Sequence, residues 1–146
     1  MASQREAACV KRLCLVVLLI AVVSLIVGCP RPALNEADDA AARAFSENKS
    51  GIQLTGEGTV TRVLADDNDG SRHQRFILRL ASGQTLLVAH NIDIAPRVPS
   101  LSAGDSVAFR GVYEWNSEGG TVHWTHHDPS GDHTAGWLKH NGSTYQ

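Results

Sequence analysis

One stretch of the chain, GGTVHWTHHDPSGDH at residues 119–133, gathers side chains that could do chemistry. It holds four of the chain's seven histidines, together with two aspartates and a tryptophan. Imidazole and carboxylate groups can bind a metal ion, exchange protons as a catalytic pair, or hydrogen-bond a ligand. The stretch is therefore a candidate functional site, and the spacing of its histidines limits which kind of site it can be.

A metal centre places the strictest demands on that spacing. On a strand, His123 and His127 share a face but lie about 13 Å apart at roughly 3.3 Å per residue, too far for one metal with ligand bonds of about 2.0–2.1 Å. A metal site therefore requires the strand to end near Thr125, so that side chains of the following loop converge. The candidate metal ligands are then His126, His127, Asp128 and His133, with His90 as a further one.

Two other interpretations remain open. In the first, a histidine forms an acid–base pair with Asp128 or Asp93. In the second, which assigns no chemistry, Trp124 packs inward and the imidazoles hydrogen-bond backbone carbonyls at the rim of the domain. The chain has no H-E-x-x-H or G-x-S-x-G motif, and its three cysteines all precede residue 30, which excludes cysteine nucleophiles and cysteine zinc sites from the later residues. The cofactor, if one is used, is not identified by the sequence, and whether the protein is an enzyme is left open.

Residues 1–29 predict export. Three basic residues precede an uninterrupted apolar run at residues 13–29, as in a signal peptide or membrane anchor. Residues 13–28 would span roughly 24 Å as a helix, less than a hydrocarbon core of about 30 Å. The run ends in LIVGC, which resembles the bacterial lipobox, so Cys29 is predicted to carry a lipid, with an uncleaved signal anchor as the alternative. The basic residues favour a cytoplasmic N-terminus, which places the remaining chain on the periplasmic side of the bacterial cell envelope.

The charge balance argues against a nucleic-acid partner. Of the 15 acidic and 13 Lys or Arg side chains, 14 and 10 respectively lie in residues 30–146. Binding to a polyanion depends on an excess of lysine and arginine, which is absent here. His73, Arg75 and Arg79 form a basic stripe on one predicted strand, and acids such as Glu114 balance it. The expected partners are the membrane, through the N-terminal segment, and an unknown small ligand.

The segments around the histidines are patterned as strands. Period-two alternation predicts five of them, within residues 58–66, 72–83, 84–93, 105–116 and 121–128. Val63 interrupts the first alternation and suggests a bulge. The long connection from the third strand to the fourth contains Pro96 and Pro99, which argue against a full helix there. Residues 52–146 are thus expected to form an all-β fold, a small five-stranded antiparallel barrel of the OB type.

Residues 30–51 predict a short helical spacer between leader and barrel. Asn35 is the expected N-cap. The apolar stripe of this helix is thin, so the helix can bury little area and is expected to dock loosely. The stripe consists of Leu34, Ala37, Ala41 and Phe45.

Two motifs, HNIDIAPR at residues 90–97 and HWTH at residues 123–126, resemble one bacterial family, domain of unknown function three-four-six-five. SRHQRFIL and GVYEWN are also similar to that family, and the resemblance covers roughly residues 55–145. It implies an envelope protein and a site shared by the two motifs, without a mechanism. The residues it emphasises are His90, Asn91, Asp93, Arg97, His123, Trp124, Thr125, His126, Asp128 and Pro129.

The leading functional hypothesis is a membrane-anchored periplasmic binding module with an OB-like barrel. Its ligand would lie where HNIDIAPR meets HWTH, contacting His90, Asn91, Asp93, Arg97, His123, Trp124, His126 and Asp128. The alternative is a metal-dependent, hydrolytic enzyme that uses the same histidines, and a purely structural envelope protein is a third possibility. The first two require His90 and the segment from His126 to Asp128 to meet at one mouth of the barrel.

Overall fold

The structure, a computed structural model, describes residues 36–146. The export leader, Cys29 and the expected cap Asn35 lie outside these residues. Within the described range, no helix is both long and apolar enough to span a membrane.

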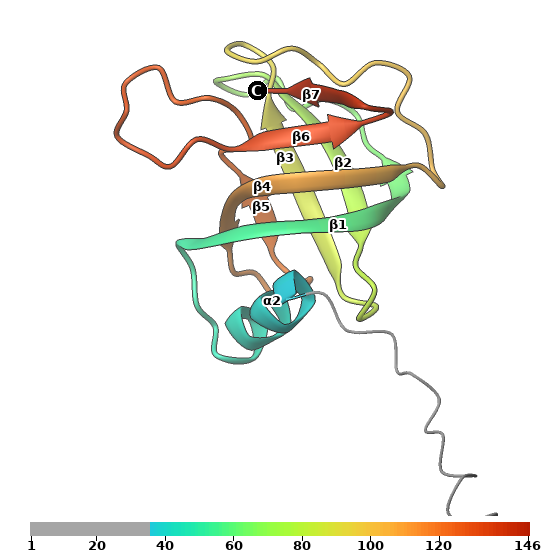
Figure 1. Ribbon diagram of the computed structural model, residues 1–146, viewed down its shortest axis with the longest axis vertical. Helices are drawn as coiled ribbons and strands as arrows, with labels where there is room; N and C mark the ends of the chain where they lie inside the picture. Colours follow the sequence, from blue (N-terminus) through green and yellow to red (C-terminus); the bar gives the residue numbers. More distant parts are fainter. Residues whose placement is uncertain (1–35) are drawn as a thin grey trace, which may run out of the picture. The chain divides into compact units, whose positions relative to one another are not determined.

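The first described element is helix α2 (Glu36–Ser46). Its first turn is acidic and its last turn contains Arg43, a distribution that complements the helix dipole. Ala41 and Ala44 are buried and belong to the main hydrophobic cluster. The Trp115 indole nitrogen donates to the Phe45 carbonyl at 3.1 Å, and the two rings stack with centroids 6.5 Å apart. The predicted helix therefore packs against the strands, which it meets at one end of the barrel (Figure 1).

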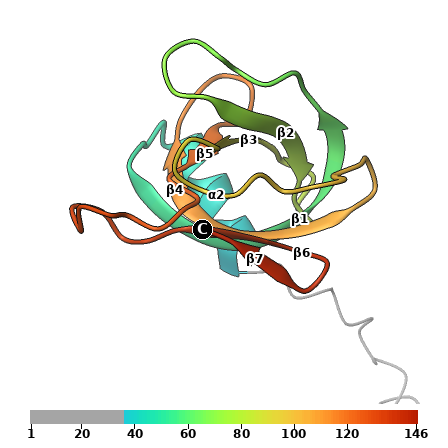
Figure 2. The ribbon, with the colours of Figure 1, turned by 90° about the horizontal axis from the view of Figure 1, so that it is seen from above.

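Seven strands follow, and five of them close into a barrel. The strands are β1 (Ile52–Val63), β2 (His73–Arg79), β3 (Thr85–Asn91), β4 (Ser106–Glu114), β5 (Thr121–His123), β6 (Trp137–His140) and β7 (Ser143–Tyr145). The sheet runs β1-β2-β3-β5-β4, and β1 pairs with β4 to close it. Figure 2 looks into the resulting ring. The OB-like barrel expected from the sequence is consistent with this order.

Two details of the expected fold were wrong. The barrel is not wholly antiparallel, because β3 and β5 run parallel, with Val88 beside Val122. The chain also continues into the β6–β7 hairpin, in which Ala108 of β4 pairs with Lys139 of β6. Parallel pairing follows from the order of the closed sheet, and the alternation within one strand carries no information about it.

Strand β1 pairs with a different strand in each half of its length. Its residues up to Thr59 pair with β4, and those from Thr59 onward pair with β2. The register shifts between Val60 and Arg62, which confirms the bulge that Val63 suggested and locates it at Thr61. The bulge bends the strand where it changes partner.

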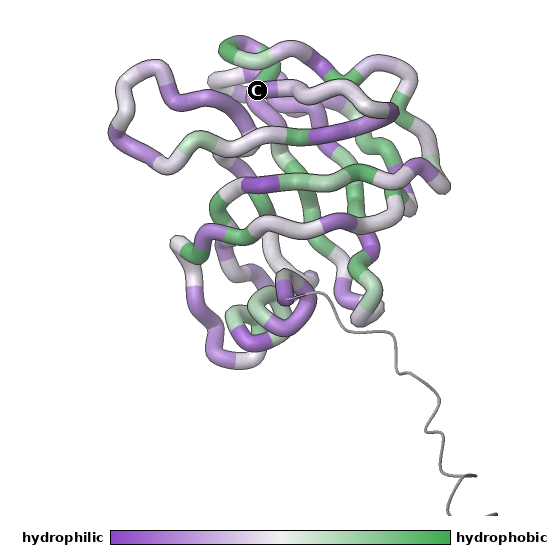
Figure 3. Tube along the Cα trace, viewed as in Figure 1, coloured by the Kyte–Doolittle hydropathy of each residue, from purple (hydrophilic) through white to green (hydrophobic). Residues whose placement is uncertain are grey.

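The core fills the barrel from alternate strand positions. Its largest buried apolar side chains are Leu54, Phe76, Leu78, Leu86, Phe109, Tyr113 and Leu138. Figure 3 shows hydrophobic residues interspersed with hydrophilic ones along the strands, as expected when only one face of each strand is buried. The connection at residues 92–105 contains no helix, as its prolines predicted. It crosses the end of the barrel opposite α2 (Figures 1 and 2).

Candidate functional site

The HWTH segment turns sharply out of the sheet. Strand β5 ends at His123, and Trp124 has a left-handed backbone with φ of 52°. Two glycines leave room for this path. A Cβ on Gly111 would lie 2.4 Å from the His123 carbonyl oxygen, and one on Gly136 would lie 1.9 Å from that of Trp124. The strand therefore ends two residues earlier than the metal interpretation required.

His90, at the end of β3, joins the two motifs from inside the barrel. Its side chain is fully buried, with Nε2 3.1 Å from the Pro96 carbonyl oxygen and Nδ1 2.9 Å from Thr125 Oγ1. A carbonyl only accepts, so Nε2 carries the proton and Nδ1 accepts from the Thr125 hydroxyl. Burial lowers the pKa of His90 to about 4, and the nearby His126 and His73 act in the same direction. His90 is thus a neutral, doubly bonded link between HNIDIAPR and HWTH.

His126 is held by its own neighbour. The side chain is 4 % exposed, and its Nδ1 lies 2.8 Å from the His127 carbonyl oxygen. Because Nδ1 must donate in that bond, the neutral ring leaves Nε2 with a free lone pair. The Trp124 ring lies near three imidazoles, with centroid distances of 4.1 Å to His133, 5.3 Å to His126 and 6.1 Å to His123.

A cleft of about 250 Å³ lies over these side chains. The strand register forms it on the outer face of the barrel, because His73 pairs with Asn91 and Val88 lies beside Val122. Because outward-facing positions alternate with buried ones such as Val88 and Val122, the side chains of His73, Asn91 and His123 point outward together. The residues that line the cleft are His73, Ala89, Asn91, Ile94, His123, Trp124 and His126.

His123 faces the cleft from β5. Its Nε2 lies 3.6 Å from Glu114 Oε1 and is a buried nitrogen without a hydrogen-bond partner. Burial lowers the pKa of His123, while Glu114 opposes this effect. The side chain is therefore held close to the carboxylate without a full hydrogen bond to it.

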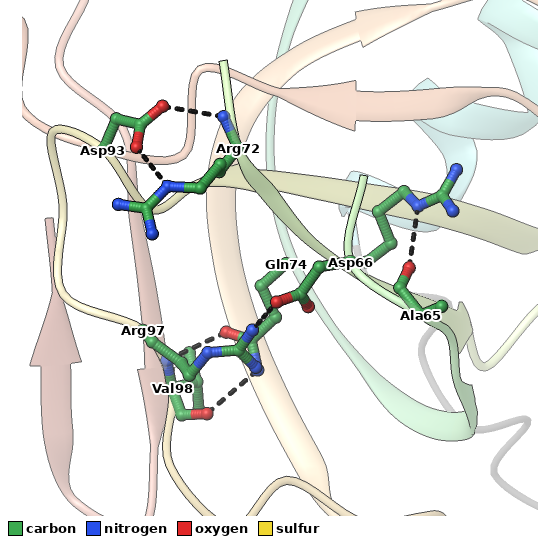
Figure 4. A network of polar contacts seen from close by, with 8 residues as sticks. Ala65, Asp66, Arg72, Gln74, Asp93, Arg97 and Val98 are labelled. Atoms are coloured by element: carbon green, nitrogen blue, oxygen red, sulfur yellow. Dashed lines mark hydrogen bonds and ion pairs between the residues drawn. The ribbon is translucent and has the colours of Figure 1, made fainter. Parts of the chain in front are cut away.

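The other predicted residues of HNIDIAPR stabilise loops. Asp93 accepts from the Arg72 backbone N–H at 2.7 Å and from its Nε at 2.6 Å, and the hydrogen bonds from Arg72 lower the pKa of Asp93. Arg97 is paired with Asp66. Figure 4 shows both pairs, which connect residues 92–105 to the β1–β2 loop. Neither Asp93 nor Arg97 is among the residues that line the cleft.

A buried amide completes this connection. Gln74 donates from Nε2 to the Val98 carbonyl at 2.9 Å and accepts from the Val98 N–H at 2.9 Å (Figure 4). Both bonds lie in the interior, where an unpaired backbone group is costly. The loop that carries Pro96 is therefore fixed over His90.

Asp128 organises the loop after HWTH. Its carboxylate accepts from the backbone N–H groups of Ser130 at 2.9 Å and His133 at 2.6 Å, and these bonds lower its pKa. His127 is exposed. Across residues 36–146, no three His, Cys, Asp or Glu side chains are grouped closely enough to hold a metal ion. In the same range, neither Asp128 nor Asp93 bonds to an imidazole ring.

The sequence model of one protein family, described as protein of unknown function (DUF3465), matches residues 22–146. The chain belongs to the DUF3465 family. The family expected from HNIDIAPR and HWTH is thereby confirmed, and the match begins earlier than residue 55. A comparison with curated proteins found no match.

Three cleft residues of this DUF3465 protein were not among the sequence-predicted site residues. His73 had been assigned to a basic stripe, and Ala89 and Ile94 had no assigned role. The alternation of β2 did indicate that His73 points outward, but only the β3–β5 pairing places it near His123. A further histidine, His140, is buried, and its Nε2 lies 3.0 Å from Asp105 Oδ2. Neither residue lines the cleft.

The bond between His90 and Thr125 gives a test of how the DUF3465 motifs are joined. In Thr125→Val the shape is kept but the hydroxyl is lost, leaving His90 Nδ1 buried without a donor. We expect a loss of about 1–3 kcal/mol in the free energy of unfolding, measured by urea denaturation. Thr125→Ser keeps the hydroxyl and serves as the control. Equal stability of the Val variant and the wild type would contradict this role for Thr125.

Proposed function

We propose that this DUF3465 protein is a membrane-anchored periplasmic binding module whose small ligand occupies the outer cleft of β2, β3 and β5. The observation that carries the proposal is the convergence of ring side chains from two segments distant in the chain, His73 of β2 and the HWTH segment with His123, Trp124 and His126, around one hollow. Ile94 adds a large apolar side chain that is 50 % exposed at the same place. A packed rim needs no such arrangement, whereas a binding cleft combines apolar walls with a few placed polar groups.

The size of the cleft supports a small ligand. Pockets for drug-sized molecules have about 300–1,000 Å³, and this cleft has about 250 Å³. His90 does not line the cleft, because it occupies a buried, inward-facing position of β3, where both of its ring nitrogens are bonded. The ligand-binding set is consequently revised to the residues that line the hollow, with His90, Asp93, Arg97 and Asp128 as supports.

The binding proposal can be tested by a ligand screen on the full chain. A mixed library of small polar compounds, followed by amide and indole chemical shifts, should give saturable shifts at Asn91, Ile94 and Trp124. Asn91→Ala should weaken any such ligand about tenfold, the effect of one lost hydrogen bond. The exposed His127→Asn variant is the matched control and should bind normally. Ligands that shift only residues remote from the cleft would contradict the proposal.

Anchoring through residues 1–29 makes a separate prediction. Mass spectrometry of the protein purified from bacterial membranes should find Cys29 as the mature N-terminal residue, carrying acyl chains. Cys29→Ser should abolish that modification and leave the leader attached. An intact N-terminus in the wild type would instead support the uncleaved signal anchor, because Cys29 becomes the N-terminal residue only when the leader is cleaved before it.

A further inference from the structure

The outer cleft carries no formally charged side chain. None of its seven lining residues is Asp, Glu, Lys or Arg. Among the charged groups nearby, Arg72 pairs with Asp93 at 2.6 Å, and the Glu114 carboxylate lies 3.6 Å from His123 Nε2, a nitrogen that is itself buried. An ion entering the cleft would lose hydration without gaining an opposite charge, which is strongly unfavourable. The lining therefore favours an uncharged ligand.

Among the polar groups of the cleft, His126 and Asn91 each have one hydrogen-bonding atom whose role their other bond defines. His126 donates from Nδ1 to the His127 carbonyl, so in the neutral ring its Nε2 is an acceptor. Asn91 uses its Oδ1 to accept from the Asp93 N–H at 2.9 Å. Its amide nitrogen has no acceptor among residues 36–146 and remains available as a donor. A ligand that satisfies both groups must itself donate one hydrogen bond and accept another.

The remaining walls are apolar. Ala89 and Ile94 contribute aliphatic surface, and Trp124 contributes an aromatic ring. A hydroxyl group both donates and accepts, and the ring of a sugar presents hydroxyls around its edge and C–H groups on its face. We propose that the ligand of the cleft is a single neutral sugar ring, with hydroxyls bonded to His126 Nε2 and the Asn91 amide nitrogen and its C–H face against Ile94. This inference rests on the proposed binding function and deepens it.

At Asn91 and His126, a substitution can remove the atom proposed to bind the ligand and keep the side chain's hydrogen bond to the neighbouring backbone. Asn91→Asp retains the oxygen that accepts from Asp93 N–H but loses the amide donor. His126→Asn retains a nitrogen that can reach the His127 carbonyl, as Nδ1 does, but lacks the Nε2 acceptor. His127→Asn, on the exposed neighbour, is the matched control. Each cleft variant should fold with a thermal midpoint close to that of the wild type.

The test is a titration of the full chain in a polyoxyethylene detergent, which avoids sugar headgroups. The probes are glucose, N-acetylglucosamine and a linear tetramer of N-acetylglucosamine, with acetate and methylammonium as charged probes. We expect a neutral sugar to shift the Trp124 indole and Asn91 amide signals saturably. Asn91→Asp and His126→Asn should each weaken that binding at least about tenfold, whereas His127→Asn should not.

The outcomes separate the two proposals. Tetramer binding more than tenfold tighter than monomer binding would identify an envelope glycan as the source of the ring, and equal binding would identify a free monosaccharide. If acetate or methylammonium occupies the cleft and the sugars do not, the sugar inference is wrong and the binding module stands. If no sugar shifts the cleft signals, the inference is also overturned, and the mixed-library screen decides the binding function independently.

Discussion

Replacing Gly136 by alanine is expected to destabilise the protein by at least about 3 kcal/mol, in the upper range for overpacked positions. The added Cβ would lie 1.9 Å from the Trp124 carbonyl oxygen and 2.5 Å from that of Arg110. Both contacts are with backbone, so neither can be relieved by rotating a side chain. Arg110 belongs to the β4–β6 pairing, and movement of its carbonyl would disturb that ladder.

A matched glycine in the same loop isolates the effect of the close approach. Gly131 has a positive φ of 75° and open space where a Cβ would be. Gly131→Ala should therefore cost only the backbone strain of a left-handed alanine, about 1–2 kcal/mol. Urea denaturation of both variants measures the difference. Similar losses for the two glycines would show that the HWTH turn is not held by close packing against residue 136.

Acidification is expected to destabilise the protein through His90 by up to about 3 kcal/mol, since each pKa unit corresponds to about 1.4 kcal/mol. The pKa of His90 is about 4 in the folded protein, against an ordinary value of 6.5. Between these values the unfolded chain binds a proton that the folded protein excludes. Stability is therefore greatest above about pH 6.5 and falls as the pH decreases toward 4. The pKa of His123 is also lowered, so this side chain adds to the loss of stability on acidification.

The contribution of His90 can be isolated by comparing slopes of stability against pH. His90→Gln can still donate to the Pro96 carbonyl but cannot titrate, so the variant should lose most of the slope between about pH 6.5 and pH 4, whatever its stability at neutral pH. His127→Asn, which removes an exposed histidine, should keep the wild-type slope. An unchanged slope in His90→Gln would show that another group governs the acid sensitivity.

Much of the fold was predictable because it depends on local pattern. The alternation of Phe76, Leu78 and Leu80 with polar neighbours identifies a strand and the face that it buries. Pro96 and Pro99 excluded a helix from the third connection, and the irregularity at Val63 indicated the bulge. These features depend on backbone conformation and burial of a few adjacent residues, which the sequence displays directly.

The site was predictable as two segments but not as a set of side chains. HNIDIAPR and HWTH do meet, through the bond between His90 and Thr125. The sequence could not show that His90 faces inward as a neutral support, or that Asp93 and Arg97 pair with Arg72 and Asp66. The same type of polar residue can face either a ligand or a neighbouring loop, so only the tertiary arrangement distinguishes these roles.

The sequence by itself determined the family, the approximate positions of five strands and the two motifs, because each depends on adjacent residues or on short periodic patterns. It did not show that β1 already begins at Ile52 or that β5 ends at His123. The tertiary structure alone decided that β3 and β5 run parallel, that β6 and β7 extend the sheet, and that His73 joins His123 at one cleft. Alternation specifies which face a residue occupies but not which strand lies beside it. Partners distant in the chain are selected by closure of the barrel, and the cleft is a consequence of that closure.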